Sequence, residues 1–87
     1  MKSVIIGESN GASMETIMGI YPRHKAFLET FVARNEVLGV GPFTDFGNMA
    51  IFRTREAAEA FAKGDPFMLE GVVKAYAIRD WDDRMLS

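Results

Sequence analysis

The order in which hydrophobic residues repeat along the chain is the feature that most constrains its fold. Residues 2–7, 36–42, 47–54 and 71–81 are short runs rich in β-branched residues and are predicted strands. Residues 13–35 and 55–63 carry hydrophobic residues at helical spacing. The order strand, helix, strand, strand, helix, strand predicts an α+β fold of the split βαβ, ferredoxin-like type, with a four-stranded antiparallel sheet and both helices on one face.

The predicted helical region between residues 13 and 35 divides into two segments. Ser13 is a candidate N-cap, and Gly19 and Pro22 are expected to kink or break the helix before its second segment. That second segment has a stripe of hydrophobic residues on one face: Phe27, Leu28, Phe31 and Val32.

The only histidine of the chain lies on this hydrophobic face. His24 stands three positions before Phe27 and four before Leu28, and residues at these offsets share a helix face. One interpretation is a core histidine whose ring nitrogens bond to backbone groups. The other is a general acid or base, or a ligand-binding group, that lines a pocket near the helix N-terminus.

Both faces of the predicted sheet carry hydrophobic residues, although two helices cover only one of them. Val4 and Ile6 alternate with Ile5, and the strands at 47–54 and 71–81 show the same pattern. An uncovered hydrophobic face marks an association surface. We therefore expect a symmetric homodimer in which two sheets meet through their open faces.

Composition narrows the possible functions. The 87 residues suit one domain. The net charge of −2, with Lys and Arg scattered singly, argues against binding to nucleic acid and against binding to an anionic membrane surface. The absence of cysteine removes thiolate catalysis and Cys-based metal sites, and the single histidine lacks metal-ligand spacing, so no metal or other cofactor is expected. The run at residues 4–6 is too short for a membrane span or signal peptide, which predicts a soluble, cytoplasmic protein.

Asp65 is the second candidate site residue. As an N-cap followed by Pro66, it is typical of the start of a short helical turn. In the predicted layout, however, the end of the second helix lies over the same sheet as the start of the His24 helix. Asp65 is then able to accept a hydrogen bond from one imidazole nitrogen and leave the other as a base. Capping and pairing use different lone pairs, so the two interpretations are compatible.

Three motifs in order resemble the YCII-related (YciI-like) family across essentially the whole chain. These are the serine-led helix from Ser13 into Pro22-Arg23-His24, the strand that ends in Gly41-Pro42, and Asp65-Pro66-Phe67 followed by the Gly71-led last strand. The resemblance implies one YCII-like domain over residues 1–87, a dimeric α+β barrel, and a His–Asp pair in a pocket. Members often have an arginine three residues before the histidine, where this chain has Tyr21, with Arg23 beside the histidine instead.

The resemblance also implies an activity like that of hydroxyhydroquinone dehydrochlorinases, which eliminate HCl without a cofactor in aromatic compound degradation. The leading hypothesis is a lyase or isomerase in which His24, held by Asp65, takes a proton from a small hydroxylated aromatic or lactone. The candidate substrate-binding residues are Tyr21, Arg23, Phe67 and Glu8. The alternatives are a non-enzymatic dimeric protein that binds a small metabolite and a cofactorless monooxygenase. Residues 82–87 are a polar tail, either disordered or clasping the partner subunit.

Overall fold

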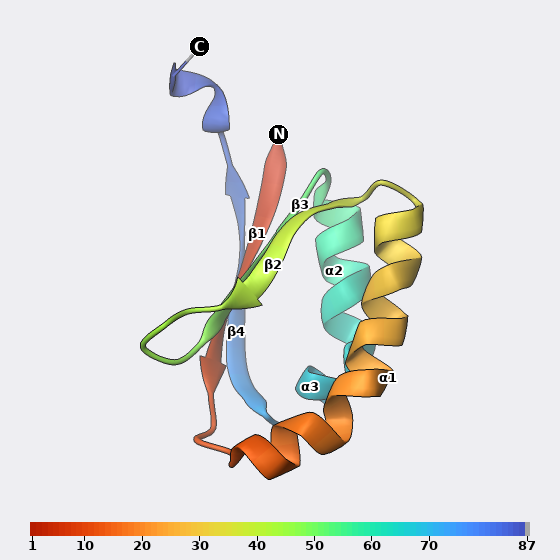
Figure 1. Cartoon of the computed structure of the whole chain (residues 1–87). Coiled ribbons are helices and arrows are strands. Elements are labelled where there is room, and N and C mark those ends of the chain that lie inside the picture. The colour runs from red at the N-terminus through yellow and green to blue at the C-terminus, as the bar shows by residue number, and fades with distance from the viewer. Residues whose placement is uncertain (87) are drawn as a thin grey trace.

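A computed structural model describes residues 1–86 of the chain. Its elements, in order, are β1 (Lys2–Ser9), α1 (Met14–Ala33), β2 (Val37–Pro42), β3 (Asn48–Phe52), α2 (Arg55–Gly64), α3 (Pro66–Leu69), β4 (Val73–Trp81) and the short 3₁₀ helix η1 (Asp83–Leu86). The strands form one antiparallel sheet in the order β2-β3-β1-β4, and the helices lie on one side of it (Figure 1). The predicted α+β, ferredoxin-like order of elements is confirmed.

The strand register shows which residues face the helices. Ile5 of β1 pairs with Ala50 of β3 and with Ile78 of β4, and all three contribute to the hydrophobic core. Their neighbours along β1 therefore point away from the helices, since successive side chains alternate between faces. Ile6, which pairs with Met49 and Ala77, belongs to this open face.

The core lies between the helices and the sheet. Phe52, Phe61 and Ile5 are almost fully buried, and Phe31 packs edge-on against both Phe52 and Phe61. Helix α2 turns Ala57, Ala58 and Phe61 inward, and all three are buried. Small alanines bring α2 close to the sheet, so the end of α2 is held at a fixed height above it.

Helix α1 is one continuous helix of 20 residues through Gly19 and Pro22, so of the expected kink or break it shows a kink. Figure 1 shows its first turns lying across one end of the molecule before the helix turns to run along the sheet. Pro22 removes one backbone donor within the helix, and Ile20 close by is buried. Val32 is 54% exposed and lies outside the buried stripe.

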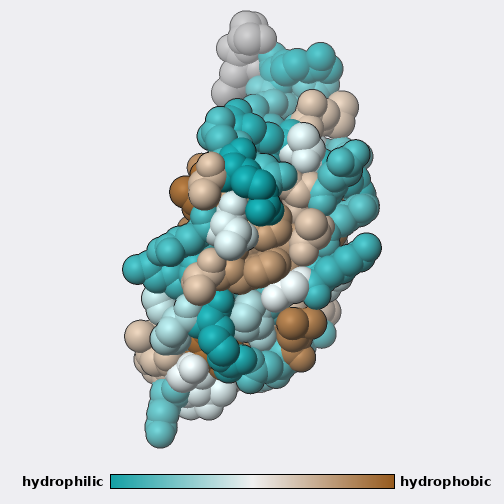
Figure 2. Space-filling model, turned by 90° about the vertical axis from the view of Figure 1, so that its right-hand side faces the viewer, coloured by the Kyte–Doolittle hydropathy of each residue, from teal (hydrophilic) through white to brown (hydrophobic). Residues whose placement is uncertain are grey.

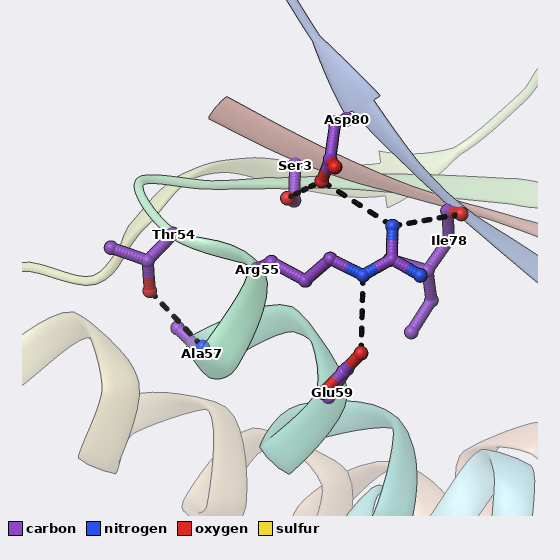
Figure 3. Close-up of polar contacts among 7 residues, drawn as sticks. All are labelled: Ser3, Thr54, Arg55, Ala57, Glu59, Ile78 and Asp80. Atoms are coloured by element: carbon purple, nitrogen blue, oxygen red, sulfur yellow. Dashed lines mark hydrogen bonds and ion pairs between the residues drawn. The ribbon is translucent and has the colours of Figure 1, made fainter. Parts of the chain in front are cut away.

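A polar network joins the start of α2 to the sheet (Figure 3). Arg55 bonds to Glu59 within α2, and its guanidinium reaches Asp80 of β4 at 3.3 Å. The buried Ser3 hydroxyl donates to the same Asp80 oxygen at 2.8 Å. The Ser3 hydroxyl and the Arg55 guanidinium lower the pKa of Asp80. This network stabilises the end of the sheet that is opposite α3.

The two surfaces of the protein differ in character. The face seen from the α1 side is mainly hydrophilic around a smaller hydrophobic area (Figure 2). The open face of the sheet instead carries a hydrophobic set of side chains with charged residues along its margins. The hydrophobic members are Val4, Ile6, Met49, Ile51, Ala75 and Ala77, and the charged ones are Lys2, Glu8 and Arg79.

The β2–β3 loop extends to the side of the sheet away from the helices (Figure 1), with Phe46 at its tip 83% exposed and at a φ of 82°. The tail after Trp81 forms η1, where Lys2 pairs with Asp83. The last residue of the predicted polar tail, residue 87, lies outside the described part of the chain.

Candidate active site

The lone histidine lies where α1 meets α3 and the end of α2. His24 is partly buried, with 12% of its side chain exposed. Its Nδ1 atom lies 2.7 Å from Oδ1 of Asp65, although 41 positions separate the two residues. The structure therefore brings the two candidate site residues into direct contact.

Asp65 also has the capping position that its sequence context predicted. Its side chain accepts a hydrogen bond from the Phe67 amide at 3.3 Å, with Pro66 at the first helical position of α3. The carboxylate side chain is 4% exposed, so its two bonds form away from bulk solvent. A carboxylate only accepts hydrogen bonds, which places the proton of neutral His24 on Nδ1 and leaves Nε2 as an acceptor.

Three aromatic rings surround the imidazole. Phe67 lies closest, with ring centroids 4.5 Å apart, while Tyr21 and Phe61 are at 6.0 Å and 6.1 Å. Phe61 belongs to the core, whereas Tyr21 is 42% exposed. The rings restrict rotation of the imidazole and form apolar walls next to it.

His24 and Asp65 open onto a cavity of about 750 Å³. The cavity lies between the first half of α1, the sheet and the β2–β3 loop, and its lining includes Tyr21 and Phe67. Its volume is in the range that holds a small organic molecule. The arrangement is able to accept a proton at Nε2 from a ligand bound in this cavity and to stabilise the resulting imidazolium through Asp65.

Two other predicted substrate-binding residues lie outside this cavity. Arg23 points to the protein surface and pairs with Glu70, which raises the pKa of Arg23. Glu8 lies two and four positions after Ile6 and Val4 on β1, and residues at this spacing share a face of the strand. Glu8 therefore points to the open face of the sheet. There it lines a shallower depression of about 620 Å³ together with Asp45 and Lys74. The structure does not bring Arg23 or Glu8 to His24.

The sequence analysis missed several polar residues of the cavity, among them Ser9, Thr44 and Asn48. Asn48 follows Gly47 at the start of the predicted strand 47–54. The one related sequence signal is the pair Gly39 and Gly41 in the predicted strand before it, since glycine in a strand favours close approach of other groups to the backbone.

Within residues 1–86 no group of three or more His, Asp or Glu side chains is arranged to hold a metal ion. In the same part of the chain, no helix has the length and hydrophobicity needed to cross a membrane.

Comparison with known proteins gives a fold relative and a family. A solved structure of 5-chloro-2-hydroxyhydroquinone dehydrochlorinase from Burkholderia phenoliruptrix AC1100, in complex with 2,5-dihydroxybenzoquinone, is similar with a TM-score of 0.76. The similarity covers 94% of each chain at 23% sequence identity. No curated protein matches the chain significantly. The YCII-related domain matches residues 1–82, and the chain therefore belongs to the YCII-related family.

Proposed function

We propose that this protein is a cofactor-independent lyase or isomerase that removes a proton from a small hydroxylated aromatic or lactone. The observation that carries the proposal is the 2.7 Å contact between His24 Nδ1 and Asp65 Oδ1 at the wall of a cavity. A base oriented by a buried carboxylate is the arrangement that proton abstraction requires. Catalysis of this kind accelerates a reaction about 10²- to 10⁴-fold, which suits a substrate that is already activated.

The cavity walls support an aromatic substrate. Phe67 and Tyr21 flank the imidazole on the cavity side, and planar rings pack favourably against such side chains. The similar dehydrochlorinase structure holds a dihydroxybenzoquinone, a planar oxygenated ring. A hydroxylated ring is therefore the first substrate class to test.

Elimination of HCl needs a proton acceptor and a leaving chloride. The substrate O–H bond breaks as Nε2 of His24 takes the proton, and the oxygen electron pair forms a carbonyl bond. The His24 imidazolium gives this proton to the ring carbon that bears chlorine as the electrons shift through the ring. His24 then takes the proton of a second ring hydroxyl, and chloride leaves with the C–Cl bonding pair. The net change is loss of HCl, with neither oxidation by an external acceptor nor reduction by a donor. An isomerase would instead transfer the proton to a carbon of the substrate and release no chloride.

We also propose that the protein acts as a homodimer through the open face of the sheet. Ile6 is 38% exposed at the centre of this face, beside Met49 and Ala77. A hydrophobic surface of this kind on a small domain is typical of a subunit interface. The expected interface buries roughly 1,200–2,000 Å² in total.

The direct test is chloride release, or a change in ring absorbance, across a panel of chlorinated hydroxyquinols and lactones. We expect turnover by the wild type and its loss in His24→Ala, while ligand binding is retained. Binding without turnover of any panel member would support the alternative, a dimeric protein that holds a small metabolite without transforming it.

A further inference from the structure

We propose that Asn48 contacts the substrate, donating a hydrogen bond from its carboxamide to a second ring oxygen on the side of the cavity opposite His24. This inference rests on the proposed function, because it assigns the substrate class of the same site. It predicts a ring with at least two oxygen substituents, one for His24 and one for Asn48.

The position of Asn48 on the sheet places it across the cavity from the histidine. Asn48 is the first residue of β3 and pairs with Gly7 of β1. Two residues further along the same pair of strands, Ile5 and Ala50 face the helices. Asn48 and Gly7 therefore also face the helix side, where Asn48 lines the cavity from the sheet while His24 lines it from α1.

The glycine opposite Asn48 makes room for its side chain. A Cβ atom on Gly7 would lie 2.4 Å from the Asn48 side-chain oxygen and 2.9 Å from Cγ1 of Val73. Gly47, with a φ of 83°, packs against the same place, where an added Cβ would lie 2.8 Å from the Gly7 carbonyl oxygen. The Asn48 side-chain oxygen thus occupies the space that a side chain at position 7 would fill, against the β1 backbone.

The carboxamide has hydrogen-bonding capacity that the fold does not use. Within residues 1–86 no side-chain hydrogen bond is formed by Asn48, although the residue is half-buried. In contrast, both other polar groups deep in the site, His24 and Asp65, bond to each other. A fixed, partly buried amide with free donors beside a cavity is suited to ligand recognition.

The chemistry of the proposed reaction gives this amide a role. When a ring hydroxyl loses its proton, electron density moves into the ring carbons, and the second ring oxygen becomes a carbonyl when its own proton is lost on the way to the quinone. A carbonyl oxygen only accepts hydrogen bonds. The Asn48 NH₂ group supplies a donor without adding a charge, as an oxyanion-stabilising amide does in other enzymes. A ligand with one oxygen can satisfy His24 or Asn48, but not both.

The test compares the binding of hydroquinone and phenol, followed by NMR titration of the full-length protein. We expect the wild type to bind hydroquinone about three- to tenfold more tightly than phenol, the effect of one net hydrogen bond. Asn48→Ala and the nearly isosteric Asn48→Asp, which loses the donor, should both remove this preference. Thr44→Val is the matched control, because it deletes a polar group that also lines the cavity, and it should keep the preference.

Each outcome of this experiment decides the matter. Equal preference in wild type and both Asn48 variants, absence of any preference in the wild type, or absence of binding would overturn the proposal. The unfolding midpoint of each variant establishes that the protein is folded during the titration. This experiment measures binding, whereas the proposed catalysis is tested by turnover. Unchanged turnover in His24→Ala would contradict the catalytic role, and an unchanged binding preference in the Asn48 variants would contradict the Asn48 assignment.

Discussion

A Cβ atom on Gly64 would lie 2.5 Å from Cζ of Phe27, so the end of α2 approaches α1 as closely as the absence of a side chain allows. Phe27 packs against Phe31 and Phe61 and has little freedom to move aside. Gly64 directly precedes Asp65, so this contact also sets the distance between the carboxylate and His24.

Gly64→Ala should therefore destabilise the protein by about 1–3 kcal/mol, the usual cost of overpacking a core. The free energy of unfolding in urea measures the effect. Gly19→Ala is the matched control, because Gly19 lies in α1 with nothing within 4 Å of an added Cβ. It should stabilise the protein by roughly 0.5–1 kcal/mol through helix propensity. Equal changes in both variants would contradict the close contact.

Asp65 variants should separate the capping role from the catalytic one. Asparagine caps helices as well as aspartate does, so Asp65→Asn should retain most of the stability while lowering turnover about 10²- to 10⁴-fold. Asp65→Ala should lose turnover and also about 0.5–2 kcal/mol of unfolding free energy. Full turnover in Asp65→Asn would show that the carboxylate does not assist the histidine.

The Asp80 network predicts a contribution to stability that disappears in acid. Because the folded state lowers the pKa of Asp80, the contribution is complete above the ordinary value of 3.8 and is lost as the pH falls through the folded-state value. The difference in unfolding free energy between wild type and Asp80→Asn should therefore shrink below that value. The effect is small, because Arg55 and Asp80 are about half exposed. A difference that stays constant with pH would contradict this assignment.

Ile6→Glu should dissociate the proposed homodimer, because it adds a charge at the centre of the open sheet face. Sedimentation velocity measures the mass, and circular dichroism measures the fold. Val32→Glu is the matched control, since Val32 is also exposed but lies on α1, away from the sheet. A monomeric wild type, or dissociation by both variants, would rule out the proposed interface.

The sequence was sufficient to predict the order of the elements. It was also sufficient to predict that Asp65 approaches His24, because this order of elements places the two helices that carry or precede these residues on the same side of the sheet. The sequence predicted a kink or a break at Gly19 and Pro22 without deciding between them, and the structure has a bent but continuous helix. The side of the sheet that Glu8 faces follows from Ile5. Because Ile5 packs into the core, Glu8, three positions later, points to the opposite face of the sheet. Asn48 could not be distinguished from an ordinary turn residue without the Gly7 contact.

The 41-residue separation between His24 and Asp65 has a consequence for folding. Neither α1 alone nor a fragment that ends with α2 contains both His24 and Asp65. The proposed activity should consequently vanish in step with global unfolding, and a species whose helices are formed but not packed on the sheet should be inert.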